Sequence, residues 1–444
     1  MNMSAWERQQ DPRTSVTIHT LPNRNLQLLL LTLAFAAAAY ARTALNPVQE
    51  SLRLALGLTD GQTALLQGPA LALPIVLLAI PLGFLIDRQS RIRLLLMLAS
   101  LDLIGSLLTA LAQGFSTLIV GRCLVGLSAF ATNPVALSLV SDLYSPSQRG
   151  RALTALALGG AAGLSGAFGL GGLLLSMSGS DQHDWRWVML WLTAPLVFVL
   201  VALLIMREPP RTDVVVEHPS LRQALSELWA YRGIVTPLLT AVALAEIALG
   251  AMIVWAAPTL ARTFTLGLDR VAGIMAFGLM VSGLLGPVAG GVLADVCQRL
   301  GGPRRTMTVV STLTLACVPT GLFSMLPDFA LAAFCLFVFI TLTIAIVTME
   351  TTLFTIVVPN ELRGLCSGML VAVCVLVGTG LAPLTVSLLS TATGGPGSLG
   401  RALSIVCVAA NVAASIVCIL SRRSLPRNLG VSAGESNLGA NLHP

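Results

Sequence analysis

The chain has 444 residues, of which 55% are hydrophobic and only 10% are charged, with a formal net charge of +6. Soluble domains usually carry about a quarter charged residues, so this composition excludes an ordinary water-soluble protein and indicates that lipid covers much of the surface. The positive charge could indicate a nucleic-acid partner, but all the basic residues are arginines, and most of them lie in or near short loops between apolar stretches. Such loop arginines are typical of membrane topology, and we expect no nucleic-acid partner.

The chain begins with a polar stretch, residues 1–25, which does not have the form of a cleaved signal peptide and which we expect to be a cytoplasmic tail. Twelve later stretches are long and apolar enough to span a membrane, since a spanning helix needs about 20 such residues. They are residues 26–48, 63–87, 92–112, 116–142, 150–177, 186–206, 233–262, 269–295, 304–326, 329–358, 362–391 and 398–421. The sequence therefore predicts an all-α integral membrane protein with twelve transmembrane helices.

One long break separates the first six predicted spans from the last six. Residues 207–232 are rich in proline and charge, and leucines recur at helical spacing, which indicates an amphipathic helix on the membrane surface. We therefore expect two six-helix bundles, residues 26–206 and 233–421, joined by this cytoplasmic linker and followed by a cytoplasmic tail, residues 422–444.

The distribution of arginines predicts the orientation. Two arginines lie within predicted spans, five fall in segments on one side, and all the others fall on the side that holds both termini. The five are Arg53, Arg186, Arg262, Arg270 and Arg401. Because arginine is enriched in cytoplasmic loops, we expect both termini in the cytoplasm and the chain in a bacterial inner membrane.

The two halves repeat a loop pattern. Gly83, Asp87 and Arg91 follow the second span, and Gly291, Asp295 and Arg299 follow the eighth with the same offsets. A weaker repeat pairs residues 146–150, which include Arg149, with residues 359–364. Parallel repeats of this kind are typical of secondary transporters, whose substrate site lies between the halves.

The first copy of this loop, which also contains Arg88, resembles the loop signature of the major facilitator superfamily. The resemblance implies that Asp87 contacts the start of another helix near Leu362 and that Arg91 pairs with Asp142. This cytoplasmic gate would hold the halves together in the outward-open state, with Gly83 and Gly291 permitting close helix contact. The alternative is an ordinary positively charged inner loop. The second copy departs from the signature, because Val296 follows Asp295.

Further segments resemble the spinster-like branch of this superfamily, which transports lysolipids and sphingosine phosphates in eukaryotes. They are Tyr40–Arg42, Leu66–Gln67, Gly121–Ala129, Ser141–Tyr144 and Arg207–Arg211. That branch typically has two carboxylates where this chain has Ala41 and Ala129. The resemblance therefore implies that any proton coupling uses other acids.

Five charged residues lie inside predicted spans, where each costs about 2.5–3.5 kcal/mol at a helix centre, so we expect them to face a cavity or each other. We expect Arg42 and Arg122 to bind the substrate, and Glu246, Glu350 and Asp102 to be candidates for ion coupling. Structural pairing is the alternative for each. Further candidates for the cavity lining are Asn46, Gln67, Asn133 and Trp255, although satisfied amides and a core tryptophan are equally common.

The sequence thus predicts a secondary transporter, and not an enzyme, that moves an anionic or amphiphilic small molecule, lysolipid-like in type, by alternating access. We expect it to be a monomer, with protons as the candidate coupling ion. A proton-driven multidrug exporter is the alternative. A membrane enzyme or sensor is more remote, since none of the four histidines lies in a span and no nucleotide phosphate loop occurs. The eight cysteines form no CxxC or Cys/His cluster, so we expect no metal and no cofactor.

Overall fold

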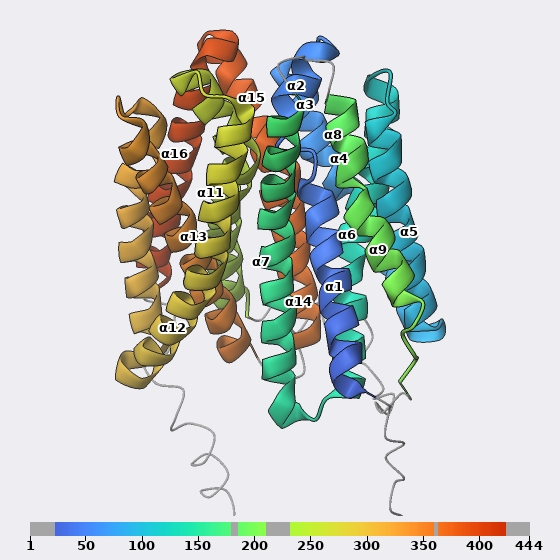
Figure 1. Cartoon of the computed structure of the whole chain (residues 1–444). Helices are drawn as coiled ribbons and strands as arrows, with labels where there is room; N and C mark the ends of the chain where they lie inside the picture. Colours follow the sequence, from blue (N-terminus) through green and yellow to red (C-terminus); the bar gives the residue numbers. More distant parts are fainter. Residues whose placement is uncertain (1–22, 179–184, 210–230, 359–362, 423–444) are drawn as a thin grey trace, which may run out of the picture.

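The computed structural model describes residues 23–178, 185–209, 231–358 and 363–422. These residues form long helices that lie side by side in one bundle (Figure 1). We call the end of the bundle where α1 begins at Arg24 the terminal face, and the opposite end the distal face. The predicted amphipathic helix in the linker lies outside the described residues, as do most of the two tails.

The N-terminal half contains six crossings. Two of them are divided in two, because α3 continues into α4 across Gly68, and α8 continues into α9 across Thr193. The helices are α1 (Arg24–Thr43), α2 (Gln49–Ala55), α3 (Asp60–Gln67), α4 (Pro69–Arg88), α5 (Arg91–Ala110), α6 (Phe115–Leu143), α7 (Pro146–Met177), α8 (Trp185–Leu192) and α9 (Ala194–Leu203). The short helix α2 lies on the distal face, between the first two crossings (Figure 1).

The C-terminal half begins with α11 and ends with α16. Its elements are α11 (Arg232–Phe264), α12 (Leu268–Thr320), η3 (Phe323–Met325), α13 (Phe329–Val357), α14 (Arg363–Val373), η5 (Cys374–Leu381), α15 (Ala382–Thr393), η6 (Gly395–Ser398) and α16 (Leu399–Ser421). The π-helix η5 joins α14 to α15 within one crossing. π-Helical turns are rare and occur frequently at functional sites.

The number of crossings follows from a break inside α12. Eleven helices among the described residues are long and apolar enough to cross a membrane. The longest includes α12, whose 53 residues would measure about 80 Å if straight, far more than the hydrocarbon core of about 30 Å. Its backbone leaves the helical conformation at Gly301 and at Gly302, where φ is 64°. Counting α12 as two spans gives twelve, which confirms the predicted fold class and returns α16 to the terminal face.

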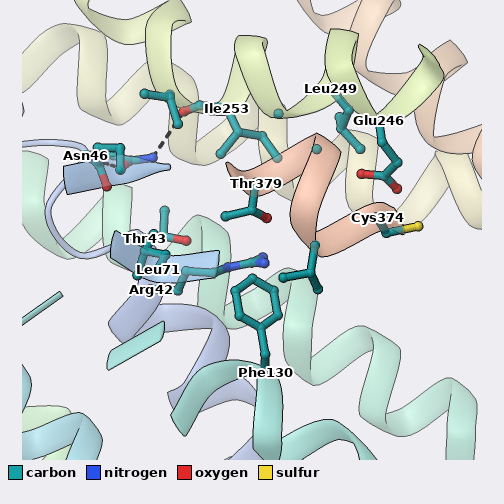
Figure 2. Close-up of a pocket in the computed structure, with 15 residues that line it drawn as sticks. Arg42, Thr43, Asn46, Leu71, Phe130, Glu246, Leu249, Ile253, Cys374 and Thr379 are labelled. Carbon is teal, nitrogen blue, oxygen red and sulfur yellow. Dashed lines mark hydrogen bonds between the residues drawn. The ribbon is translucent and has the colours of Figure 1, made fainter. Parts of the chain in front are cut away.

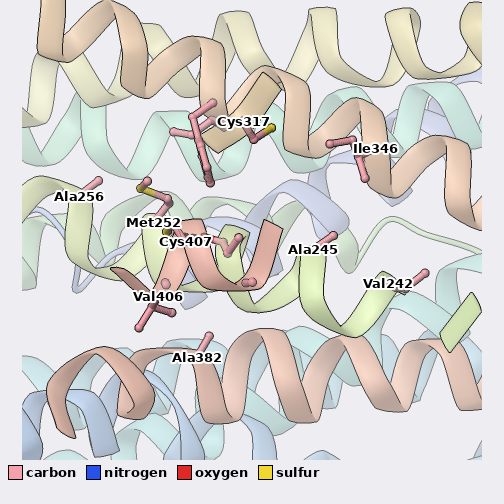
Figure 3. Close-up of a cluster of buried hydrophobic side chains, with 14 of the residues drawn as sticks. Val242, Ala245, Met252, Ala256, Cys317, Ile346, Ala382, Val406 and Cys407 are labelled. Atoms are coloured by element: carbon pink, nitrogen blue, oxygen red, sulfur yellow. Dashed lines mark hydrogen bonds between the residues drawn. The ribbon is translucent and has the colours of Figure 1, made fainter. Parts of the chain in front are cut away.

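Each half has its own apolar core. In the C-terminal half, Val242, Ala245 and Met252 of α11 belong to one buried cluster with residues such as Ile346 of α13 and Cys407 of α16 (Figure 3). Two further buried clusters lie within the N-terminal half. The first cluster also includes Ala64 of α3 and Phe168 of α7, so its packing continues across the interface between the halves.

Helix α7 contacts both halves through small residues. A side chain at Gly163 would overlap the carbonyl oxygen of Ala36 in α1. Towards the distal face, a Cβ at Gly172 would lie 3.0 Å from Ala272 in α12. Glycine therefore permits α7 to approach α1 and α12 closely, as small residues do in membrane helix packing.

Candidate functional site

Two cavities meet between the halves, near the middle of the bundle. The first has a volume of about 290 Å³ and many polar groups (Figure 2). Its lining is Arg42, Thr43, Asn46, Gln67, Leu71, Phe130, Glu246, Leu249, Gly250, Ile253, Val254, Cys374, Val375, Gly378 and Thr379. We call it the polar cavity.

The second cavity has a volume of about 520 Å³ and lies on the terminal side of the first. Its walls are mostly apolar and include Phe35, Leu164, Ile340 and Leu370, and we call it the apolar cavity. The two cavities share part of their lining, namely Arg42, Phe130, Leu249, Ile253, Cys374 and Val375. A single elongated molecule can therefore occupy both.

Arg42 lies where the two cavities join. It stands at the end of α1, and its guanidinium carbon is 5.2 Å from the centroid of the Phe130 ring, a cation–π contact. The guanidinium has no hydrogen bond or ion pair to any described residue, and Figure 2 shows it reaching past Phe130 towards Thr379. Glu246 lines the same cavity from α11 and interacts electrostatically with Arg42. A positive charge is thus available to a ligand.

Arg122 does not line either cavity. Its side chain is fully buried, and its guanidinium donates hydrogen bonds to the carbonyl oxygen of Arg42 at 2.8 Å and to Oε1 of Gln67 at 2.7 Å. Its Nε also points at the carbonyl of Leu66, at 3.4 Å. Its Nη1 has no hydrogen-bond partner among the described residues, so a substrate contact by Arg122 stays a prediction. In this conformation Arg122 positions other residues of the site.

A chain of amide side chains forms the distal wall of the polar cavity. Gln67 donates to Oδ1 of Asn46 at 2.6 Å and to Oε1 of Gln49 at 2.9 Å. Asn46 in turn donates to the carbonyl oxygen of Ile253, at 3.1 Å. That last bond joins the two halves of the protein, because Ile253 belongs to α11.

The three acids predicted for coupling lie in different places. Glu246 packs against the π-helix, since a Cβ at Gly378 would lie 2.6 Å from its Oε2. Glu350 is fully buried in α13, and neither of its carboxylate oxygens has a hydrogen-bond partner among the described residues. Asp102 borders a void of about 10 Å³ in the N-terminal half, apart from the two large cavities.

Of the other two residues predicted to line the cavity, one does so and one is a core residue. Asn133 lines the apolar cavity. Trp255 is fully buried and donates a hydrogen bond from Nε1 to the carbonyl oxygen of Pro383 at 3.0 Å, which makes it a core residue that joins α11 to α15. A buried indole usually needs such a partner, and this contact keeps Trp255 out of the cavity lining.

The predicted cytoplasmic gate lies at the terminal face. Arg91 forms an ion pair with Asp142, as the resemblance implied, and a second one with Glu208 at 3.2 Å. Glu208 also accepts hydrogen bonds from the backbone N–H groups of Arg91 and Ile92, both at 3.0 Å, so it caps the start of α5. Burial by itself would raise the pKa of Glu208, but these hydrogen bonds and one from Ser90 lower it below its ordinary value.

Sequence reasoning missed Glu208, although its place in the charged run after the sixth span was a signal. Nearby, Arg149 donates to the carbonyl oxygens of Tyr144 and Ser141, at 3.1 and 2.8 Å, and so stabilises the end of α6. Arg88 is exposed and has no ion pair among the described residues. These contacts lie within the N-terminal half, so the role of this cluster as a lock stays a prediction.

The rest of the gate is not assembled in this conformation. A Cβ placed at Gly83 or at Gly291 would have no described atom within 4 Å, so the close helix contact expected in the outward-open state is not made in this conformation and stays a prediction. Asp295 and Arg299 are exposed and form no ion pair among the described residues. The side chain of Asp87 and its expected partner near Leu362 lie outside the described residues.

A second group of charges lies at the distal face. Arg262 of α11 donates to Oε2 of Glu50 at 2.7 Å and to Oδ1 of Asp60 at 2.8 Å. Arg53 donates to Oε1 of Glu50 at 2.7 Å and lies 3.7 Å from Asp60. We call these four residues the distal ion cluster. Sequence reasoning placed both arginines in outer segments but missed the pairing, for which the only signal was the presence of two acids, Glu50 and Asp60, in the segment that holds Arg53.

Comparisons with known proteins agree with this architecture. Residues 31–383 match the profile of the Major Facilitator Superfamily. The quinolone resistance protein NorB of Staphylococcus aureus (strain JH9) is 31% identical over 130 residues, which make up 29% of this chain and 26% of NorB. The chain thus spans about a quarter of the length of the curated relatives it matches.

Solved structures are similar over almost the whole chain. A bacterial homologue of the human lysosomal transporter Spinster, inward-facing and unoccupied, superposes with a TM-score of 0.73 at 23% identity, covering 91% of this chain and 96% of that one. A structure of the nucleoside transporter NupG gives a TM-score of 0.72 at 13% identity, covering 89% and 100%. The family match covers most of the sequence, and this chain belongs to the Major Facilitator Superfamily of membrane transporters.

Proposed function

We propose that this transporter moves an amphiphilic anion. The observation that carries the proposal is Arg42, whose guanidinium faces the junction of the two cavities and has no ion pair or hydrogen bond to the described residues. A buried charge without an ion pair or hydrogen bond is costly, and a bound anion would supply both. Charge-assisted hydrogen bonds to phosphate or carboxylate are also among the strongest that arginine makes.

The shapes of the cavities support an amphiphile over a small hydrophilic anion. The polar cavity offers Asn46, Thr43 and Thr379 for a headgroup beside Arg42. The apolar cavity of about 520 Å³ is in the size range of sites that bury drug-sized ligands, and its walls would cover an alkyl chain. A lysolipid has this combination of an anionic headgroup and one chain.

The orientation supports movement between the inner leaflet and the outside. The excess of arginines at the terminal face favours the cytoplasm for that side. The distal ion cluster joins the halves at the distal face, and we propose on this basis that the conformation is inward-facing. We propose that it acts as a monomer in a bacterial inner membrane.

Glu246 is the best-placed coupling residue. It lines the polar cavity opposite Arg42, where protonation of its carboxylate would remove a negative charge that opposes a bound anion, so proton and substrate would bind together. Glu350 lies behind it and interacts with it electrostatically. Since Ala41 and Ala129 replace the acids typical of the spinster-like branch, coupling by protons would use this pair in the C-terminal half.

The test is binding to the purified protein in nanodiscs. We expect lysophosphatidylglycerol to bind, whereas glycerol phosphate, which has no chain, binds much more weakly. Arg42→Gln should lower the affinity for lysophosphatidylglycerol by about tenfold to a hundredfold, since a hydrogen bond to a charged group is worth about 1.5–3 kcal/mol. Arg151→Gln, at an exposed position of α7, is the matched control. Equal affinity in Arg42→Gln would refute the anion site.

A proton-driven multidrug exporter is the second candidate, favoured by the acid in the polar cavity and by the partial match to a quinolone resistance protein. The same assay separates the two. A drug exporter for cations would prefer dodecyltrimethylammonium to lysophosphatidylglycerol, and it would lose that preference in Glu246→Gln.

A further inference from the structure

The substrate site and the distal ion cluster are carried by the same two segments of chain. One segment runs from the end of α1 into α2 and carries Arg42, Asn46 and Glu50. The other is α11, which carries Glu246, Ile253 and Arg262. At a rise of 1.5 Å per residue, Ile253 lies about 10 Å beyond Glu246, and Arg262 about 14 Å beyond Ile253.

Three layers of contact between the halves are therefore stacked along α11. The first is the cavity, with Arg42 facing Glu246. The second is the hydrogen bond from Asn46 to the carbonyl oxygen of Ile253. The third is the pair of two-point contacts from Arg262 to Glu50 and Asp60. A movement of α11 away from α2 and α3 must break the second and third layers together.

The four charges of the distal ion cluster balance only when the halves are together. Three members belong to the N-terminal half, and Arg262 is the sole member from the C-terminal half. Separation leaves Glu50 and Asp60 sharing Arg53 alone, with Arg262 unpaired. Side-chain exposures of 7–19% show that the cluster is mostly buried, so its bonds are stronger than those of an exposed ion pair. Each side chain still reaches water, which can solvate the charges after opening.

The pKa of Glu50 supports a working ion pair. Burial alone would raise it, but the hydrogen bonds and charges of Arg53 and Arg262 outweigh burial and lower the pKa below its ordinary value of 4.5. The cluster therefore stays charged at physiological pH. It loses its contribution only as the pH falls through that lowered value.

We infer that the distal ion cluster is the gate that closes the distal side of the transporter, with Arg262 as its moving half. The gate holds the inward-facing state, and its opening, together with release of Asn46 from Ile253, gives access to the cavities from the distal side. The gate determines which side of the transporter is open, so its role does not depend on the identity of the substrate.

Hydrogen–deuterium exchange on the full-length protein in nanodiscs tests this gate without any substrate. We expect Arg262→Gln to raise the open-to-closed ratio by about tenfold, equivalent to about 1.4 kcal/mol. Exchange should then increase in distal peptides that cover α2 and α3, and decrease in terminal-face peptides at the start of α5, because that side closes when the other opens. Simple destabilisation would raise exchange at both faces.

Three further variants complete the test. Arg270→Gln is the matched control, since Arg270 is exposed near the same face and has no ion pair among the described residues. The double variant Glu50→Gln/Asp60→Asn should reproduce the effect of Arg262→Gln. The triple variant, which combines these three substitutions, should have little further effect, because each substitution removes the same ion pairs between the halves. If Arg262→Gln does not fold, the double variant alone decides. Unchanged exchange, or a change of the same sign at both faces, would overturn the gate.

Discussion

At the scale of single residues, Arg42 and Arg122 differ in what surrounds the guanidinium. The guanidinium of Arg42 faces a cavity, whereas that of Arg122 is fully buried and bonded to two carbonyl oxygens and the amide of Gln67. Removing Arg42 therefore uncovers no buried acceptor. Removing Arg122 leaves several acceptors without a donor, and each costs about 1–3 kcal/mol.

We therefore expect Arg122→Ala to lower the thermal unfolding temperature in detergent markedly, while Arg42→Ala leaves it nearly unchanged. The measurement is intrinsic fluorescence during heating, with both variants at the same protein-to-detergent ratio. Equally large losses of stability would show that Arg42 also has a structural partner. Equally small losses would show that Arg122 is not the positioning residue inferred here.

At the scale of helices, the glycines of α7 have two different environments on one element. Gly163 packs against the backbone of Ala36 in α1, whereas Gly166 is exposed and has no described atom near its missing side chain. We expect Gly163→Ala to force α1 and α7 apart and to destabilise the protein by about 1–3 kcal/mol. Gly166→Ala should be neutral or stabilising by up to about 1 kcal/mol, because alanine is the better helix former.

Unfolding of both variants under the same denaturing conditions measures this contrast. Since the two substitutions add the same atom to the same helix three residues apart, a difference between them reports the contact with α1. If both variants unfolded alike, the close packing of α1 and α7 would not limit stability.

At the scale of the whole molecule, the arginine distribution predicts that the terminal face is cytoplasmic. Ser147 lies exposed at the terminal face and Thr263 lies exposed near the distal face. We expect an impermeant thiol reagent added to intact cells to label Thr263→Cys and not Ser147→Cys, with labelled peptides identified by mass spectrometry. Permeabilised cells are the control, in which both positions should react. Labelling of Ser147→Cys in intact cells would reverse the orientation.

The sequence alone determined the number of spans, their division into two halves and the class of protein. These properties depend on local features, because about 20 consecutive apolar residues must cross the lipid wherever they occur, and because a repeated loop such as Gly83–Arg91 is visible without any contact being known. The ion pair between Arg91 and Asp142 was also accessible, since a family motif carries it. The break at Gly302 then divided a helix that the sequence had already placed as two spans.

Only the tertiary structure decided which buried polar residues face a cavity. Arg42 and Arg122 look alike in the sequence, and so do core and lining candidates such as Trp255 and Asn133. Their roles depend on the direction of each side chain and on partners from other helices. The distal ion cluster is the clearest case, because Arg262 and Glu50 are 212 residues apart. Charges so distant in the chain meet only when the two halves pack together, and no local pattern records that contact.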